Sequence, residues 1–592
     1  MTQHIYAMAR GRVVAALGEI VPGLAEEVMA RVEVTPAKEA AHGDMATNAA
    51  MVVAKAAGMK PGEIAARLVA VLAGDDAVAG AAVAGPGFVN LTLKPAVWRG
   101  VLPWILRDGE AYGGSNVGRG VRVNIEYVSA NPTGPMHIGH CRGAVVGDAL
   151  ANVMEKAGFA VTKEFYINDA GNQITAMCWA AYWRYLQAIG TGMSEEEFAA
   201  EVPGGLQYRG EYLIAVGEAL AAAHGVALAS GSRGVAPAEM WLETVRETAL
   251  SMMLAGTRED LAVLGVRHDV FSSERALAAR GATELVIARL RAQGLIYEGT
   301  LDPPKGKAPE DWEPREQTLF RATRFGDDVD RPLRKSDGTA TYFANDIAYH
   351  ADKLGRGADM LIDVVGADHG GYVKRITAAV KALGGRVDVL TCQIVHVLKD
   401  GRPLRMSKRA GTFVTLRDLL DEVGPDAVRF TMLTRKSDAQ MEFDINQAVA
   451  QTRENPVFYV QYAHARCASV LRMAEEMFGS GFTSAESLAG AGLESLGDEA
   501  ELALVKRLAS WPRSVEGAAL AREPHRIAFF LYDLASDFHM LWNRGREDAA
   551  LRFLQAEDVV GSRARVALVA ATAVVLRSGL AVMGVAPKYE MR

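Results

Sequence analysis

Hydrophobic patterns typical of strands and helices alternate from residue 121 onward. The segment VRVNIEYVSA, which begins at Val121, is apolar and β-branched and predicts a buried strand. A Pro/Gly-rich loop follows, and GHCRGAVVGDALANVMEKAG then predicts a helix that ends at Gly158. VTKEFYIND predicts a second strand. A strand, a helix and a strand in this order form a βαβ unit, which implies a parallel sheet.

The sheet pattern is interrupted and returns later in the chain. MLIDVVGAD (360–368) predicts a strand, a helix runs on to Ala382, and VDVLTCQIVHVL (387–398) predicts a further strand. Between the two parts, residues from about 175 to 255 are helical and show no strand pattern, which indicates an insertion. We therefore predict a Rossmann-like α/β core with a parallel sheet over residues 118–440, with a helical region inserted into it.

Two further modules flank this core. Residues 1–110 combine helical patterns with a strand near their end, AAVAGPGFVNLTL (81–93), and predict a small N-terminal α+β module. After about residue 440 the helical pattern continues and no strand pattern returns. Residues 441–592 are therefore predicted to form a C-terminal all-α helical bundle.

The net charge limits where nucleic acid can bind. The formal net charge is −7 at pH 7, which excludes a basic coat over the whole protein. Lys and Arg outnumber Asp and Glu between Lys506 and Arg592, so the last part of the chain is locally basic. Any RNA-binding surface is expected to be a local patch on a mildly acidic body.

The cysteines and the apolar segments indicate a soluble cytoplasmic protein. The four cysteines lie far apart and form no Cys-x-x-Cys pair: Cys141, Cys178, Cys392 and Cys467. This spacing argues against a disulfide framework and a structural zinc site, and it fits a reducing compartment. The N-terminus lacks a signal-peptide core. ALVAATAVVL, between Arg565 and Arg577, is too short to span a bilayer and predicts a core helix, so no membrane partner is expected.

The strongest local signal is NPTGPMHIGHCRGA, residues 131–144. His137 and His140 lie in a loop that follows a strand and runs into a helix. The N-terminus of a helix favours phosphate, and two imidazoles there can donate to phosphate oxygens as negative charge builds. The alternatives are two unrelated histidines in a turn, or metal ligands. The strand–loop–helix context favours the nucleotide, and the lack of a nearby third ligand argues against a metal.

A second signal is KDGRPLRMSKRAGTFVTL, residues 399–416, which follows a predicted strand and precedes a predicted helix. Its cations are Lys399, Arg402, Arg405, Lys408 and Arg409. Several cations in one short loop suit a pyrophosphate or triphosphate group. Taken alone, the segment is better interpreted as a solvated basic loop or an RNA-contact loop.

Together the two segments resemble the paired signature motifs of the class I aminoacyl-tRNA synthetases, His-Ile-Gly-His and Met-Ser-Lys-Arg. The resemblance implies that His137, His140 and Lys408 are catalytic. Arg405 stands where many class I enzymes carry lysine, and it keeps the charge. The ATP-binding residues implied are Gly134, Pro135, Met136, His137, Ile138, Gly139 and His140, together with Arg405, Met406, Ser407, Lys408 and Arg409.

A separate group of residues must select the amino acid. Glu126 and Asn131 stand on the strand that precedes the histidine loop, where Glu126 supplies a carboxylate and Asn131 a side-chain amide. In TATYFANDIAYHADKL, Tyr342 and Asp346 are one helical turn apart and therefore share a face. Glu126 and Asp346 would give a pocket two negative charges, which suits a guanidinium, a planar and permanently charged donor fork. The alternative is a packed aromatic and a surface carboxylate on a helix.

Several segments resemble the arginyl family of class I synthetases closely: EYVSANPTGPMHIGH, YINDAGNQI, YFANDIAYH, VVGADHGGYVKR and GPDAVRFTML. The resemblance implies that Glu126, Asn131, Tyr342 and Asp346 bind arginine, with a contribution from Asp368 or His369. Asn131 is expected to orient the α-amino and carboxylate end. Tyr166, Asn168, Asp169 and Asn172 form a polar cluster at a strand end, and they either line the same pocket or serve as a turn with capping roles.

The same resemblance extends over nearly the whole chain. It implies that the N-terminal module contacts the tRNA elbow and that the C-terminal bundle binds the anticodon. Aromatics interleaved with cations in that bundle could stack on unpaired bases, although core packing is the better interpretation for most of them: Phe529, Phe530, Tyr532, Phe538 and Trp542. The final APKYEMR departs from the tail that is common in the family.

The implied reaction is activation of L-arginine by ATP and transfer to the 3′-terminal adenosine of an arginine tRNA. ATP enters with Mg²⁺ as a substrate complex, and no tightly bound cofactor and no protein metal site are expected. A monomer is expected. The family resemblance also implies the 2′ hydroxyl as acceptor and a requirement for tRNA during activation. The alternatives are a nucleotidyltransferase without tRNA, a synthetase-like RNA-binding protein without catalysis, and a synthetase for cysteine or leucine.

Overall fold

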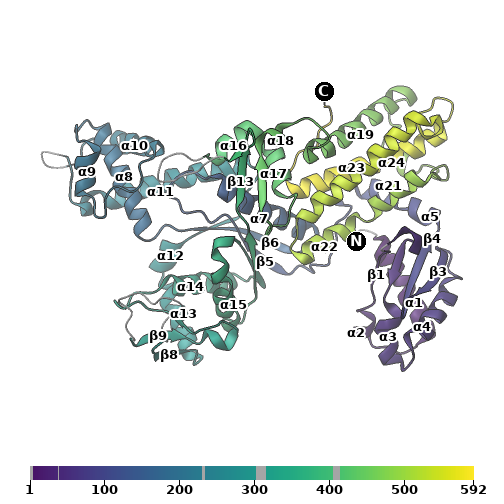
Figure 1. Cartoon of the computed structure of the whole chain (residues 1–592), viewed down its shortest axis with the longest axis horizontal. Coiled ribbons are helices and arrows are strands. Elements are labelled where there is room, and N and C mark those ends of the chain that lie inside the picture. Colours follow the sequence, from purple (N-terminus) through teal and green to yellow (C-terminus); the bar gives the residue numbers. More distant parts are fainter. Residues whose placement is uncertain (1–3, 38, 230–233, 302–314, 404–413, 592) are drawn as a thin grey trace. The chain divides into compact units, whose positions relative to one another are not determined.

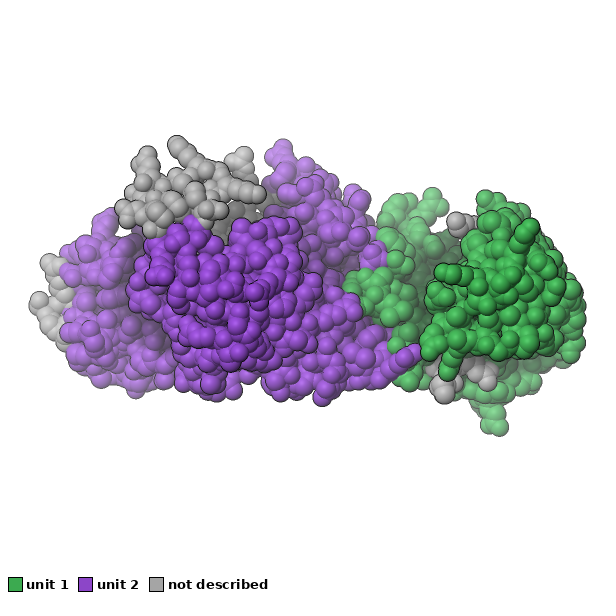
Figure 2. All heavy atoms as spheres, turned by 90° about the horizontal axis from the view of Figure 1, so that it is seen from below, with its two compact units in different colours: residues 1–117, 452–522, 526–592 green, residues 118–451, 523–525 purple. Residues whose placement is uncertain are grey.

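The computed structural model describes residues 4–37, 39–229, 234–301, 315–403 and 414–591. The chain forms two compact units, which Figure 2 colours separately. The first consists of residues 1–117, 452–522 and 526–592, and the second of residues 118–451 and 523–525. All residues that the sequence predicts for catalysis and for binding ATP or arginine belong to the second unit.

A five-stranded parallel sheet forms the core of the second unit, with the order β12–β11–β5–β6–β7. Figure 1 labels its strands β5 and β6. Its strands are β5 (Arg122–Glu126), β6 (Ala160–Ile167), β7 (Val270–Ser273), β11 (Met360–Gly366) and β12 (Val387–Cys392). Every neighbouring pair is parallel, which confirms the predicted Rossmann-like core. The strand order reverses between β5 and β11, and ligands of such sheets bind at the carboxyl ends of strands at this point.

Helix α7 (Ile138–Lys156) connects β5 to β6 and completes the predicted βαβ unit. Gly147 lets this helix lie directly against the ring of Tyr127, the residue that follows β5. A Cβ at Gly147 would be 2.3 Å from Tyr127 Cγ, closer than any real contact. The absence of a side chain at this position therefore sets the distance between the helix and the sheet.

We expect Gly147→Ala to lower the midpoint of thermal unfolding of the second unit, because overpacking a tight core costs about 1–3 kcal/mol. Gly143→Ala on the same helix is the control, since nothing lies within 4 Å of a Cβ built there. Calorimetry of both variants tests the difference. Equal unfolding midpoints for the two variants would show that the α7–Tyr127 contact is not tightly packed.

The helical insertion leaves the sheet after β6 and returns at β7. It contains α8 (Asn172–Ala188), α9 (Glu195–Glu201), η3 (Glu211–Leu213), α10 (Ile214–His224) and α11 (Ala238–Val263). These helices enclose a hydrophobic core of their own, in which Tyr182 stacks on Trp241 with a ring distance of 3.9 Å. The predicted insertion is therefore a separate helical body with its own packing.

The chain between β7 and β12 packs further helices and a small antiparallel sheet beside the core. The helices are α12 (Glu274–Ala279), α13 (Ala282–Ala292), η4 (Ala322–Phe325), α14 (Tyr342–Gly355), η5 (Ala367–Tyr372) and α15 (Val373–Ala382). The sheet has the order β10–β9–β8 and consists of β8 (Ile296–Gly299), β9 (Gln317–Phe320) and β10 (Arg331–Pro332). Apolar side chains of α13, α14, α15 and this sheet share one core.

Two predictions about strands in this part of the second unit need correction. VDVLTCQIVHVL forms two strands, because β12 ends at Cys392 and β13 (Val395–Lys399) joins another sheet of order β14–β13–β15. The guanidinium of Arg142 in α7 holds the corner by donating to the Gln393 carbonyl oxygen over 3.1 Å. Strand β15 also lies beyond residue 440, where only helices were predicted. The remaining elements here are β14 (Arg402–Pro403), α16 (Leu416–Val423), α17 (Pro425–Met432), β15 (Met441–Asp444) and α18 (Ile445–Val449).

The N-terminal part of the first unit is an α+β module, as predicted. Its antiparallel sheet has the order β1–β2–β4–β3. The elements are α1 (Ile5–Ile20), α2 (Glu26–Met29), β1 (Val34–Pro36), η1 (Ala40–His42), β2 (Met45–Thr47), α3 (Ala49–Ala57), α4 (Pro61–Leu72), β3 (Val78–Ala84), β4 (Phe88–Leu93), α5 (Pro95–Arg99), α6 (Val101–Asp108) and η2 (Gly109–Ala111). The predicted single strand over 81–93 is a hairpin of β3 and β4.

The C-terminal part of the first unit is helical. It contains α19 (Pro456–Phe478), α20 (Ala485–Ala489), α21 (Glu499–Ala509), α22 (Trp511–Ala521), α23 (His525–Glu547), η7 (Ala549–Leu551) and α24 (Val559–Met583). Helix α24 is long and apolar enough to cross a membrane, but 89% of its apolar window is buried inside the protein. This burial confirms the predicted core helix. On α23, Phe530 and Phe538 are buried in the core, whereas Phe529 and Tyr532 are exposed.

Candidate active site

The first motif places its two histidines at the start of α7. His137 is the N-cap, and its Nδ1 accepts a hydrogen bond from the Gly139 backbone N–H over 3.1 Å. The Nδ1 of His140 accepts the backbone N–H of His137 over 3.3 Å. The two rings stack with their centroids 4.0 Å apart. The histidines therefore form a reciprocal cap that fixes where the helix begins.

These bonds determine which imidazole nitrogen can donate. A neutral imidazole has one donor and one acceptor nitrogen, and in both residues Nδ1 is the acceptor. The proton of each neutral ring therefore lies on Nε2. In the neutral form of His137 and His140, the nitrogen that can donate is thus Nε2, while Nδ1 shapes the helix terminus. Among the described residues, no group of three His, Cys, Asp or Glu side chains is arranged to hold a metal ion.

The end of the second motif lies beside the first. Thr415 forms an isolated antiparallel bridge with His137, and the Leu416 N–H donates to the Met136 carbonyl oxygen over 2.9 Å. Thr415 is also the N-cap of α16. Five predicted residues of this motif lie outside the described residues: Arg405, Met406, Ser407, Lys408 and Arg409. The described end of the segment at Thr415 therefore brings the chain back to the histidine loop.

Glu126 ends β5 next to a buried lysine that the sequence did not single out. Glu126 Oε1 accepts a hydrogen bond from Ser129 Oγ over 2.8 Å, and Oε2 pairs with Lys353 Nζ. Lys353 Nζ also contacts Asp363 Oδ1 over 3.0 Å. His350 Nε2 lies 2.8 Å from the other oxygen of Asp363. The carboxylates raise the pKa of Lys353 against the opposing effect of its burial, so Lys353 is a cation that orients Glu126.

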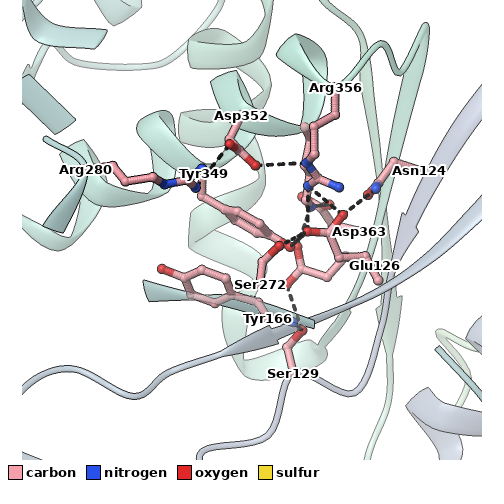
Figure 3. A network of polar contacts seen from close by, with 12 residues as sticks. Asn124, Glu126, Ser129, Tyr166, Ser272, Arg280, Tyr349, Asp352, Arg356 and Asp363 are labelled. Carbon is pink, nitrogen blue, oxygen red and sulfur yellow. Dashed lines mark hydrogen bonds and ion pairs between the residues drawn. The ribbon is translucent and has the colours of Figure 1, made fainter. Parts of the chain in front are cut away.

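A second buried carboxylate, Glu164, belongs to the neighbouring strand β6. It accepts hydrogen bonds from the side chains of four residues that Figure 3 labels: Asn124, Ser272, Tyr349 and Arg356. Burial alone would raise the pKa of Glu164, but the charge of Lys353 and the hydrogen bonds from Arg356, Ser272 and Asn124 lower it overall. Protein donors engage both carboxylate oxygens, which is typical of a structural carboxylate. The positive φ angles of Val128 (71°) and Ser129 (40°), just after β5, mark a strained turn beside it.

Asp346 lies one turn into α14 and differs from the other carboxylates in its surroundings. Burial is the main cause that raises its pKa to about 7, and the charges of Glu126 and Glu274 act in the same direction. Positive charge on His350 and a hydrogen bond with the Tyr372 side chain oppose this shift only in part. Among the described residues, no lysine or arginine forms an ion pair with Asp346, whereas Lys353 pairs with Glu126. A carboxylate in such surroundings is suited to bind the cation of a ligand.

The other residues predicted for arginine lie around this position but are not all brought together. Tyr342 begins α14 and is 71% exposed. Its hydroxyl oxygen is 3.9 Å from a Cβ built on Gly171, so the ring faces the loop after β6. Asp368 is exposed on η5, directly after β11. The side chain of His369 is not among the parts that the structure describes.

Asn131 is exposed and connects the histidine loop to the polar cluster after β6. Its Oδ1 accepts from Asn168 Nδ2 over 2.9 Å, and its Nδ2 donates to Gln173 Oε1 over 3.0 Å. Tyr166 stacks on Tyr349, and its pKa is raised first by burial and then by Glu274, Asp346 and Glu126. The charges of Asp346 and Glu126 therefore act on Tyr166, and Asn168 is joined to Asn131.

Asp169 accepts a hydrogen bond from the start of α12, so it has the capping role predicted as the alternative for the polar cluster of residues 166–172. Its carboxylate accepts from Ser273 Oγ over 2.6 Å and from the Arg275 backbone N–H over 2.9 Å. Asn172 begins α8. The capping interpretation thus applies to Asp169, and the interpretation that the other members line the pocket stays a prediction.

Three families match this chain. The family described as "tRNA synthetases class I (R), catalytic domain" matches residues 102–192 and 315–466. "Arginyl tRNA synthetase N terminal domain" matches residues 8–93, and "DALR anticodon binding domain" matches residues 460–591. The "Arginine--tRNA ligase" of Gluconobacter oxydans is 62% identical over 100% of this chain and 98% of its own length. That of Ruegeria pomeroyi is 56% identical over 100% of both chains.

The chain belongs to the arginyl-tRNA synthetase family. This family is part of class I, and its reaction is the attachment of arginine to tRNA. A solved arginyl-tRNA synthetase from Thermus thermophilus has the same fold, with a TM-score of 0.70 over 99% of this chain and 100% of that chain, at 22% identity. The match to the catalytic domain is interrupted between residues 192 and 315, a stretch that includes most of the helical insertion.

Sequence reasoning missed several side chains that support the site of this family member. Asp363 was visible as a lone carboxylate within the apolar strand MLIDVVG. His350 and Lys353 follow Asp346 by one and two helical turns, which places them on the same side of α14. A charged residue in a buried strand, combined with two cationic positions on the adjacent helix, is a signal that would have identified this group.

Proposed function

We propose that the second unit joins ATP and L-arginine where the histidine loop and the acidic site meet, and that arginyl-adenylate forms there. The observation that carries this proposal is the half-buried Asp346, whose pKa is raised to about 7, beside the oriented carboxylate of Glu126. Glu126 ends β5 at the switch point of the parallel sheet, and its charge acts on Asp346 of α14. The loop after β5 leads into the capped start of α7. Two carboxylates at this point fit a cationic amino acid that must meet a nucleotide.

ATP is proposed to lie along the N-terminus of α7. The Nε2–H groups of His137 and His140 donate to phosphate oxygens, and Lys408 approaches from the second motif. The bridge between Thr415 and His137 supports this convergence, because it holds one end of the second motif against the first. ATP is proposed to enter as its Mg²⁺ complex, with the metal carried by the nucleotide.

Arginine is proposed to place its guanidinium between Asp346 and Glu126. Asp346 supplies the ion pair, since Glu126 already shares its charge with Lys353. Tyr342 closes over the side chain from the start of α14, and Asn131 orients the α-amino and carboxylate end. Asp368 or His369 adds a contact from the segment after β11.

The reaction then has two steps. An oxygen of the arginine carboxylate attacks the α-phosphorus of ATP, the bond to the bridging oxygen breaks, and pyrophosphate leaves with the negative charge. A ribose hydroxyl of the terminal adenosine next attacks the adenylate carbonyl, loses its proton and expels AMP. We propose the 2′ hydroxyl as this nucleophile. The first unit is proposed to hold the tRNA at its elbow and anticodon, and the enzyme to act as a cytoplasmic monomer.

Exchange of labelled pyrophosphate into ATP tests the proposal. Exchange should require arginine, should not occur with cysteine or leucine, and should depend on arginine tRNA. A nucleotidyltransferase would show exchange that ignores amino acids, and a protein without catalysis would show none. Absence of exchange with arginine and its tRNA together would overturn the proposed function.

Arginine binding should weaken as the pH falls from 8 to 6. The pKa of Asp346 is about 7. The guanidinium of arginine pairs only with the ionised form of this carboxylate. Protonation therefore competes with arginine below pH 7, and the Kd should rise by up to about tenfold per pH unit well below the pKa. Equilibrium dialysis with labelled arginine measures this directly, without contributions from the histidines to the rate. A Kd that is constant between pH 6 and 8 would contradict the assigned role of Asp346.

A further inference from the structure

One tyrosine of the helical insertion donates a hydrogen bond to the loop that contains His137. Tyr212 of η3 donates from its hydroxyl to the Thr133 backbone carbonyl oxygen, with an oxygen–oxygen distance of 2.7 Å. Thr133 lies in the middle of the loop of residues 131–137, which we call the signature loop. Burial raises the pKa of Tyr212 to about 12, so its hydroxyl remains a donor at neutral pH.

Two glycines make room for this contact. A Cβ at Gly134 of the signature loop would be 3.1 Å from the Tyr212 hydroxyl oxygen. A Cβ at Gly210, in the insertion itself, would be 2.1 Å from the Tyr212 ring, which real contacts do not allow. The ring of Tyr212 is therefore enclosed between two positions without side chains. Such a fit indicates a defined position for the ring, because either added methyl group would displace it.

The signature loop needs support from outside because of its sequence. Pro132 and Pro135 have no backbone N–H groups, so the loop cannot form a regular hydrogen-bonded turn at these positions. The Thr133 N–H donates to the Asn131 carbonyl oxygen over 2.8 Å. The Thr133 carbonyl oxygen accepts instead from Tyr212 of the insertion. Gln173, at the start of α8, adds a second contact by accepting from Asn131 over 3.0 Å. The insertion thus contacts the loop at two places that precede His137.

We propose that Tyr212 is a positioning residue for adenylate formation, which fixes the signature loop from the insertion and so sets where His137 meets the nucleotide. This inference rests on the proposed function and goes beyond it, because it gives the inserted helical body a role in the chemistry. Tyr212 does not touch the reacting atoms. It acts through the Thr133 carbonyl and the packing of Gly134, and its loss should affect the rate of activation more than the binding of arginine.

The test compares Tyr212→Phe with Tyr185→Phe in the full-length enzyme. Tyr185 donates from its hydroxyl to the Gly225 carbonyl oxygen over 2.8 Å and accepts from the Leu228 backbone N–H over 3.2 Å. The control therefore removes the same kind of bond, and one more, within the insertion and away from the loop. With arginine tRNA present, Tyr212→Phe should lower kcat for pyrophosphate exchange about three- to tenfold, as expected for one lost hydrogen bond. The KM for arginine should stay within about twofold. Tyr185→Phe should leave both constants nearly unchanged.

Gly210→Ala provides a second, independent test. Its backbone suits alanine, with φ −64° and ψ 144°, but the added methyl group must displace the Tyr212 ring without altering the loop sequence. It should reproduce the fall in kcat. An unchanged kcat in Tyr212→Phe, or an equal fall in Tyr185→Phe, would overturn the positioning role while wild-type exchange leaves the proposed function intact. Absence of exchange in the wild-type enzyme would overturn both.

Discussion

Replacing Asp346 by asparagine should raise the KM for arginine by about a hundredfold, while the KM for ATP changes by less than about twofold. The substitution keeps the shape of the side chain but removes its charge. A guanidinium buried beside an amide loses the charge-assisted bonds that offset the loss of its hydration, a difference of about 3 kcal/mol. Glu126 cannot compensate, because Lys353 already occupies one of its oxygens.

Asp359→Asn is the matched control for this experiment. Asp359 precedes β11 at the opposite edge of the sheet, where it forms an exposed pair with Arg122 over 2.7 Å. The same chemical change there should leave both Michaelis constants unaltered, since exposed ion pairs contribute little. Steady-state pyrophosphate exchange with varied arginine and varied ATP separates the two constants. An arginine KM that stays within threefold of wild type in Asp346→Asn would remove this residue from the binding site.

Lys408→Ala should reduce kcat for arginine activation by about 10²- to 10³-fold with little change in the Kd for arginine. The lysine ammonium is proposed to stabilise charge that develops on the leaving pyrophosphate, so its effect is confined to the transition state. The bridge of Thr415 to His137 brings the end of the second motif to the place where this charge would develop.

Lys399→Ala is the control for Lys408→Ala. It tests whether removing another cation of the second motif lowers kcat by the same factor. Lys399 pairs with Glu422 over 2.5 Å at the exposed end of β13 and should be dispensable. Single-turnover kinetics of adenylate formation, with arginine binding measured in parallel, distinguish a lost transition-state contact from weakened binding. A fall in kcat of less than about threefold in Lys408→Ala, or an equal fall in Lys399→Ala, would refute the assignment.

The central fold was predictable because its elements follow local patterns. Buried parallel strands are continuous apolar runs, and α7 is a long helix that ends near a glycine, so the βαβ unit was evident. The division of VDVLTCQIVHVL into β12 and β13 was not evident, since both halves are apolar. The break depends on the long-range bond from Arg142 to the Gln393 carbonyl. Strand β15 was missed for a similar reason, because its four residues pair only with the distant β13.

The candidate site was predictable where a motif marks it and not where only packing forms it. His137 and Asp346 stand in recognisable segments. His137 caps the helix that follows β5, and Asp346 lies on α14, where the charge of Glu126 acts on it. The role of Lys353 depends on two carboxylates far from it in sequence, Glu126 and Asp363, so no local pattern reveals it. The role of Tyr212 could not be predicted for the same reason, since its partner Thr133 lies 79 residues away in the sequence.

The proton that Asp346 can hold near neutral pH has a consequence for molecules that imitate arginine. A ureido analogue has nearly the same shape as a guanidinium but carries no charge, so it needs a neutral partner. At pH 6 the protonated Asp346 offers such a partner, whereas at pH 8 the analogue would leave an ionised carboxylate unpaired. Discrimination against the uncharged analogue should therefore improve as the solution becomes more alkaline, and the accuracy of the enzyme would depend on the pH of its surroundings.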